Sequence, residues 1–155
     1  MDLTYRHLLV AIDGSEEAGL AFNKSIGIAK RNNAVLNLIY VVDPRTYTAI
    51  KVHGPNDDQE SFKFGKDLLE RYQTEALAAG VENVNAIVTP GSPKKVIARD
   101  FANKVEADLI VCGASGMDAM ERFMLGSVSQ HIVRRSPCDV LVVRIPDPEE
   151  VKAQV

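Results

Sequence analysis

Five short apolar segments alternate with helical patterns along the chain, and this alternation constrains the fold more than any other feature. The segments are residues 7–12, 34–42, 83–88, 107–112 and 139–143. Each has the length of a strand, and all but the third are nearly continuous in apolar character, as strands covered on both faces of a parallel sheet are. The third is more mixed, which is typical of an edge strand. The alternation predicts βαβ units and an α/β fold.

The stretches between these segments show the spacing of amphipathic helices. Apolar residues follow the helical period over 15–31 and 60–79. Ser92 and Pro93 are typical of a helix start, because serine is a common N-cap and proline is tolerated in the first turn. A last helix is expected over 127–135, just before a proline that would end it. These patterns predict helices on both faces of one open parallel sheet.

Length and composition narrow the class of protein further. The 155 residues suit a single domain, which we expect over 1–145, followed by a charged tail over 146–155. The net charge of -3 argues against broad binding to nucleic acid or anionic membranes. No apolar run approaches the ~20 residues of a membrane span, and the start of the chain lacks a signal-peptide pattern. Cys112 and Cys138 lie in or beside apolar runs, as buried small side chains do. We therefore expect a cytoplasmic protein without nucleic-acid or membrane partners.

Two polar segments follow predicted strands that would be neighbours if the sheet reverses its order between them. Residues 13–15, Asp-Gly-Ser, follow the first strand, and a glycine-rich segment over 113–129 follows the fourth. In an open α/β sheet the ligand binds beyond the carboxyl ends of the strands, where the strand order reverses. The two segments would then form one crevice.

The second segment has the groups that a polyphosphate needs. Gly113, Gly116 and Gly126 allow close approach of backbone N–H groups, and the helix expected after Gly126 begins with free N–H donors. Ser127 and Ser129 add hydroxyl groups. No lysine follows the glycines, so the segment is not a P-loop. A second interpretation stays open, since Ser127 and Gln130 also fit a capping box and loop glycines often serve turns alone.

The spacing Gly-x2-Gly-x9-Gly-Ser resembles the ATP-binding motif of the universal stress protein family. The similarity extends to AIDGSEEA at 11–18, the GSP turn at 91–93, ADLIVCGASG at 107–116 and GSVSQHIVRRSPCDVLVV at 126–143. The resemblance implies a Rossmann-like, adenine nucleotide α-hydrolase-like sheet of order 3-2-1-4-5. It implies ATP as the ligand, with Mg²⁺ or Mn²⁺ bound to the nucleotide. It also implies a homodimer formed through the fifth strand, residues 139–145, whose apolar edge would otherwise be open.

The resemblance also implies roles for individual residues, each with a simpler alternative. Asp13 would hold the ribose or a phosphate-bound metal, although it also fits the N-cap of the following helix. Ile12 and Val41 would line an adenine pocket, the Val41 backbone facing the base edge, or would be plain core. Arg122 would meet phosphate or be a solvated surface side chain. The expected nucleotide contacts are Ile12, Asp13, Val41, Gly113, Gly116, Arg122, Gly126, Ser127, Val128 and Ser129, with Asp13 as the metal contact.

The resemblance implies a nucleotide-dependent regulatory or protective protein of the stress response. The alternative is a slow ATP hydrolase or nucleotidyl transferase on the same fold, although no SGGxDS loop, phosphate-loop lysine or Ser-His pair is evident. A phospho-acceptor receiver would need an acidic cluster, an aspartate and a lysine where this chain has Asp13, Thr89 and Arg144. A dinucleotide oxidoreductase would carry GxGxxG after its first strand. No motif identifies a downstream protein partner.

Overall fold

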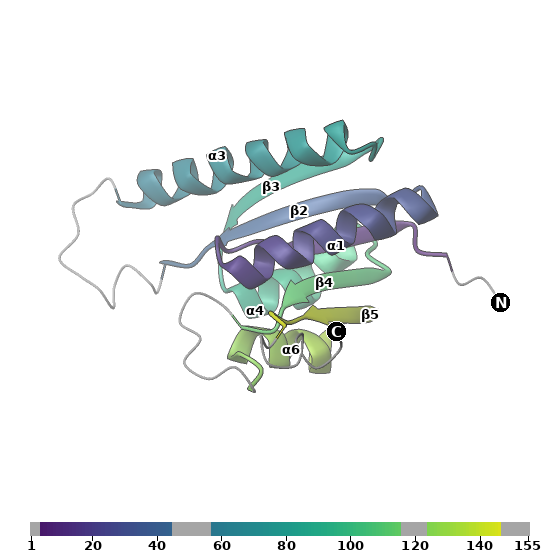
Figure 1. Cartoon of the computed structure of the whole chain (residues 1–155). Helices are drawn as coiled ribbons and strands as arrows, with labels where there is room; N and C mark the ends of the chain where they lie inside the picture. Colours follow the sequence, from purple (N-terminus) through teal and green to yellow (C-terminus); the bar gives the residue numbers. More distant parts are fainter. Residues whose placement is uncertain (1–3, 45–56, 116–123, 147–155) are drawn as a thin grey trace.

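The sheet of the computed structural model has five parallel strands in the order β3-β2-β1-β4-β5. The structure describes residues 4–44, 57–115 and 124–146. The strands are β1 (His7–Ala11), β2 (Val35–Val42), β3 (Val84–Pro90), β4 (Leu109–Gly113) and β5 (Asp139–Val143). They lie side by side in Figure 1. The predicted order 3-2-1-4-5 is confirmed, and the mixed third segment is indeed an edge strand.

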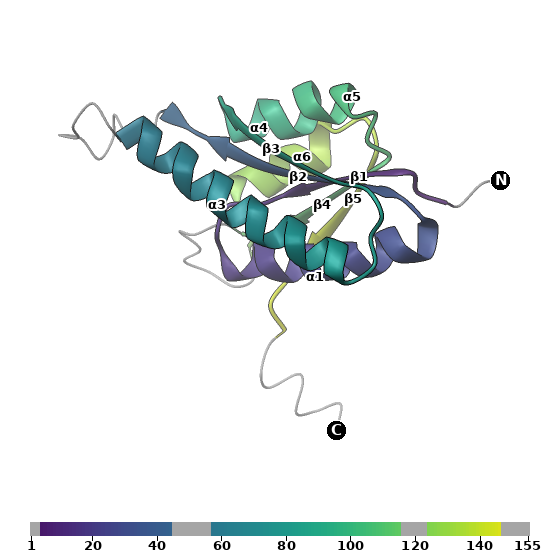
Figure 2. The same cartoon turned by 90° about the horizontal axis from the view of Figure 1, so that it is seen from above.

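Helices cover both faces of the sheet, as predicted. They are α1 (Glu16–Asn32), α3 (Asp57–Ala78), α4 (Pro93–Lys95), the π-helix η1 (Val96–Phe101), α5 (Ala102–Lys104) and α6 (Ser127–Arg135). Figure 2 shows α1 and α3 on one side of the sheet and α4, α5 and α6 on the other. Of these described helices, none is long and apolar enough to cross a membrane.

Two apolar cores lie on the two faces of the sheet, because alternate residues of a strand point to opposite faces. On β1, Leu8 and Val10 join the core beneath α1 and α3, whereas Leu9 joins the core beneath η1 and α6. All three side chains are fully buried. In the first core Phe22 of α1 stacks on Tyr72 of α3, with ring centroids 4.4 Å apart. Burial on both faces explains the continuous apolar character of the segment.

One polar pair interrupts the apolar interior. Asn37 of β2 is only 3% exposed. Its Nδ2 donates to the Leu8 carbonyl of β1 at 3.0 Å, and its Oδ1 accepts from Asn85 Nδ2 of β3 at 3.0 Å. The Asn37 amide therefore bonds to both strands that flank β2.

The segment predicted as one helix after Ser92 is a composite. Ser92 holds the N-cap position and Pro93 the first helical position, as expected. The wider π-helical turn of η1 then separates the short helices α4 and α5. Such π-helical turns occur often at functional sites. Here the composite helix brings Pro93 and Ile97 to the wall of a pocket.

Two helical glycines give opposite expectations for substitution by alanine. A Cβ on Gly65 of α3 would overlap the Tyr40 ring, whereas a Cβ on Gly19 of α1 would only touch the Tyr72 hydroxyl at 3.4 Å. Gly65→Ala should lower the free energy of unfolding by about 1–3 kcal/mol through overpacking. Gly19→Ala should raise it by up to ~1 kcal/mol through helix propensity. Urea unfolding measures both, and a stabilised Gly65→Ala variant would contradict the packing at Tyr40.

Candidate functional site

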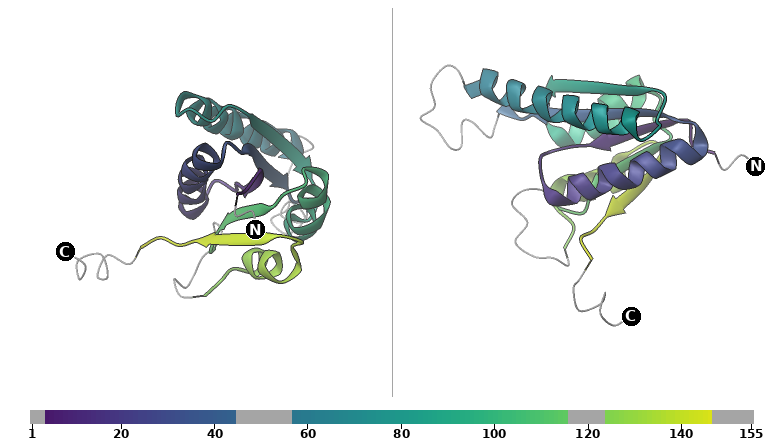
Figure 3. Two further views of the ribbon diagram at one scale, coloured as in Figure 1. Left: turned by 90° about the vertical axis from the view of Figure 1, so that its right-hand side faces the viewer. Right: turned by 45° about the horizontal axis from the view of Figure 1, so that its top comes forward.

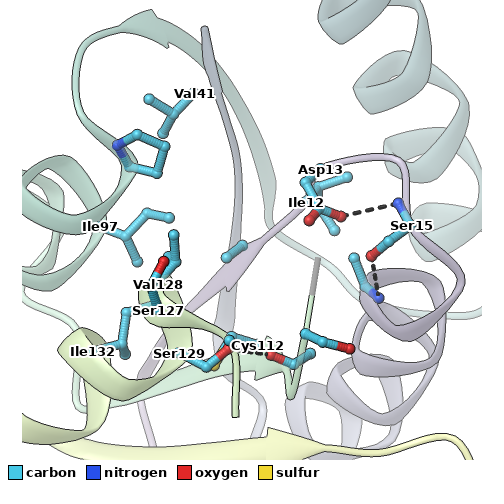
Figure 4. A pocket seen from close by; sticks show the side chains of 16 residues that line it. Ile12, Asp13, Ser15, Val41, Ile97, Cys112, Ser127, Val128, Ser129 and Ile132 are labelled. Atoms are coloured by element: carbon cyan, nitrogen blue, oxygen red, sulfur yellow. Dashed lines mark hydrogen bonds between the residues drawn. The ribbon is translucent and has the colours of Figure 1, made fainter. Parts of the chain in front are cut away.

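A pocket of about 370 Å³ lies beyond the carboxyl ends of β1 and β4, where the strand order reverses. Figure 4 shows its wall, with Val41 and Ile97 on one side and Asp13 with Ser15 on the other. Most of the predicted set lines this pocket. Those residues are Ile12, Asp13, Val41, Gly113, Gly126, Ser127, Val128 and Ser129. The other two predicted residues, Gly116 and Arg122, lie outside the described residues.

One wall of the pocket is apolar and comes from several elements. Val41 belongs to β2, Ile97 to η1, and Val128 and Ile132 to α6. Pro93 of α4 completes this wall. Ile97 and Pro93 were not predicted as pocket residues, although their position after the third strand places them at the same edge of the sheet. The apolar wall can receive a flat, weakly polar group such as a nucleobase.

The N-terminus of α6 supplies the polar end of the pocket. Gly126 is the N-cap in an extended conformation (φ -65°, ψ 162°), and the Gln130 N–H makes the first helical bond, to the Gly126 carbonyl at 3.0 Å. Within the described residues the N–H groups of Ser127, Val128 and Ser129 have no hydrogen-bond acceptor. These groups are free to bind an anion.

The capping-box interpretation of Ser127 is wrong. Ser127 is the first helical residue and not the N-cap, so its side chain is not placed to cap the helix. The Gln130 side chain donates instead to the Leu125 carbonyl, at 2.9 Å. Ser127 thus remains on the pocket wall without a capping role.

Ser129 has a structural bond that bears on its predicted role. It is 5% exposed, and its Oγ donates to the Gly113 carbonyl at 2.7 Å. This bond joins α6 to the end of β4. Because the hydroxyl proton is used there, the Ser129 backbone N–H is the donor that stays available to a ligand.

Asp13 stands at the mouth of the pocket in a tight turn. Its Oδ1 accepts from the Ser15 N–H at 2.9 Å, and Gly14 between them has φ +87°. The N-cap of α1 is Ser15, whose Oγ accepts from the Ala18 N–H at 3.2 Å. The N-cap interpretation of Asp13 is therefore wrong. Its exposed carboxylate keeps acceptor positions for a ribose hydroxyl or a cation.

Asp13 is the one charged side chain among the described residues of the pocket wall. In the same part of the chain no group of three or more His, Cys, Asp or Glu side chains is placed to hold a metal ion. A magnesium ion needs only one or two protein carboxylates when phosphates supply further ligands. The Asp13 carboxylate can therefore serve as one protein ligand of a metal ion that a nucleotide carries.

The fold and the pocket define a single-domain α/β protein with a ligand site at the reversal point of its sheet. A family model described as the universal stress protein family matches residues 4–144. A Staphylococcus saprophyticus protein named for this family is 50% identical over 154 residues, covering 99% of this chain and 92% of that protein. The chain belongs to the universal stress protein family, and the resemblance found in its motifs is confirmed.

Solved structures of the family share this fold. Universal stress protein UspA from Lactobacillus plantarum is 32% identical with a TM-score of 0.77, covering 92% of this chain and 100% of that chain. A universal stress protein crystallised in complex with cAMP is 27% identical with a TM-score of 0.71, covering 92% of this chain and 99% of that chain. The second of these structures contains a cyclic adenine nucleotide.

Cys112 on the pocket wall should be chemically inert in the folded protein. It is 3% exposed, and burial raises the pKa of its thiol to about 11, although the contact with Ser129 acts in the opposite direction. At pH 8 the thiolate fraction should be roughly a hundredfold lower than in the unfolded chain. In a Cys138→Ser variant, iodoacetamide should label Cys112 slowly until denaturant is added. Equal rates with and without denaturant would contradict the buried thiol.

Proposed function

We propose that this protein binds an adenine nucleotide, with ATP as the main ligand, and acts as a nucleotide-dependent regulatory or protective protein in the stress response. One observation carries the proposal. A single pocket combines an apolar wall at Val41 and Ile97 with the free N–H groups at the start of α6. A nucleotide has the matching division into a flat base and an anionic phosphate.

The walls of the pocket suggest how the nucleotide lies. The base packs against Val41 and Ile97, and the phosphates bind at the N-terminus of α6 beside Ser127. The ribose then lies near Asp13, which also contacts a Mg²⁺ or Mn²⁺ ion carried by the phosphates. The relative in complex with cAMP supports an adenine nucleotide as the class of ligand.

A binding protein fits this pocket better than the alternative, a slow ATP hydrolase or nucleotidyl transferase. Fast phosphoryl transfer needs a positioned nucleophile and cationic groups that stabilise the developing charge. The described residues of the pocket wall include no lysine, arginine or histidine. A steady-state hydrolysis assay with Mg²⁺ and with Mn²⁺ separates a binding protein from an enzyme.

We also propose that the protein forms a homodimer through β5 and works in the cytoplasm. β5 lies at one margin of the sheet and is drawn in yellow in the left-hand view of Figure 3. Among the described strands it pairs with β4 alone. The chain continues beyond this strand to Ile145, which is 41% exposed. A second copy of the same strand would cover this apolar edge.

Gly126→Val should weaken ATP binding tenfold or far more. The valine side chain would stand between the ligand and the N-terminus of α6, so that two or three charge-assisted bonds of roughly 1.5–3 kcal/mol each are lost. The backbone of Gly126 has φ -65°, which valine also adopts, so the protein should still fold. Calorimetric titration with ATP and Mg²⁺ measures the effect.

Ser127→Ala is the control and should weaken binding less than Gly126→Val, because it removes one hydroxyl and keeps the N–H donors. Equal affinity of the wild type and Gly126→Val would refute the site.

Two proline variants in β5 test the dimer. The Val143 carbonyl accepts from the N–H of Ala114, the residue directly after β4, at 2.8 Å, so the backbone groups of Val143 face β4. Backbone groups alternate in direction along a strand, and the Val142 N–H therefore points to the open edge. Val142→Pro should produce a folded monomer, whereas Leu141→Pro should break the ladder with β4 and destabilise the fold. Sedimentation measures the mass, and an unchanged dimer in Val142→Pro would exclude pairing through β5.

A further inference from the structure

The Glu17 side chain makes a contact that the nucleotide-binding proposal does not use. Glu17 lies in the first turn of α1, and its Oε2 accepts two hydrogen bonds from Ser115, one from the backbone N–H at 2.6 Å and one from Oγ at 2.9 Å. Ser115 lines the pocket, and Glu17 holds it by these two bonds without lining the pocket itself. A carboxylate therefore occupies both hydrogen-bond donors of a residue on the pocket wall.

The absence of a side chain at Gly113 brings these groups together. A Cβ on Gly113 would come within 2.9 Å of the Glu17 Cβ and 3.1 Å of the Glu17 carbonyl carbon. The first turn of α1 thus packs directly against the end of β4. From there the Glu17 carboxylate reaches Ser115, two residues further along the chain.

Because of the Glu17–Ser115 contact, the two polar sides of the pocket suit different groups of a ligand. Ser115 has one N–H and one O–H, and both donate to Glu17, so only lone pairs of its oxygen stay available to a ligand. Glu17 also places a negative charge next to Ser115, and Asp13 adds another on the pocket wall. At the start of α6, in contrast, the described N–H groups of Ser127, Val128 and Ser129 have no acceptor. A ligand hydroxyl suits the first side, and a phosphate suits the second.

We propose that Glu17 is a specificity-determining residue that excludes phosphate from the Ser115 side of the pocket and leaves that side to a neutral hydroxyl of the ribose. This inference rests on the proposed function. With the base against Val41 and the 5′-phosphate at α6, the ribose hydroxyls face the remaining polar wall, which holds Asp13 and Ser115. A phosphate on the 3′ oxygen would meet the carboxylate-bound serine. Glu17 acts through Ser115 and does not contact the ligand.

The pair 5′-AMP and 3′-AMP tests the inference, because the two isomers have the same base and the same number of phosphates. Calorimetry without metal should show that the wild type prefers 5′-AMP. Glu17→Gln removes the negative charge with little change in shape and should reduce this preference by roughly tenfold. Glu16→Gln is the matched control, since Glu16 is an exposed carboxylate in the same helical turn. It should leave the preference unchanged.

A second variant separates the carboxylate from the serine hydroxyl. Ser115→Ala keeps the backbone N–H bond to Glu17 and should retain most of the preference for 5′-AMP. A wild type that binds both isomers equally, or a Glu17→Gln variant that keeps the full preference, would overturn the inference alone. Equal weakening of both isomers in Glu17→Gln would also overturn it, because a purely structural role has that effect. If neither isomer binds to the wild type but ATP with Mg²⁺ does, the inference fails alone. If ATP with Mg²⁺ does not bind either, the proposed function fails and the inference with it.

Discussion

β1 lies in the middle of the sheet, between β2 and β4, and the chain leaves β1 and β4 toward opposite faces. From β1 it passes to α1, whereas from β4 it passes to α6 on the other face, as Figure 2 shows. Right-handed crossovers on both sides of β1 produce this divergence. The helices α1 and α6 therefore lie on opposite faces, and the pocket lies at the strand ends beside their N-terminal turns. Most groups on the pocket wall belong to these two helices, to the residues just before them, or to a strand end.

The polar groups around the pocket fall into two classes, those that the fold itself uses and those that it leaves open. Ser15 caps α1, and Ser129 bonds to the Gly113 carbonyl. Ser115 bonds to Glu17. These contacts join α1, β4 and α6 around the pocket and fix its shape before any ligand arrives. The open N–H groups at the start of α6 are held in place by this framework, which reduces the entropy lost when a ligand orders its contacts.

Strand positions, helix faces and sheet order could be predicted from the sequence, because they depend on apolar periodicity and on a family motif. The residues that cap the N-termini of the helices were harder to predict. Asp13 and Ser15 are both good N-cap residues, and the choice between them depends on the turn at Gly14. The contact between Glu17 and Ser115 joins residues far apart in the chain, and no local spacing indicates it. The π-helical turn that brings Ile97 to the pocket likewise has no signature in residue spacing.

The amide of Asn37 has a consequence for the pocket, although it lies within the sheet and away from the strand ends. A slip of β2 by two residues against its neighbours β1 and β3 would keep every apolar side chain on its own face, so the apolar pattern alone does not forbid it. Such a slip would move the Asn37 oxygen away from the Asn85 amide and bury it without that donor. It would also shift Val41 along the sheet by roughly 6–7 Å relative to Asp13. A buried amide thus sets the alignment of the two strand ends, and with it the depth at which a base can enter the molecule.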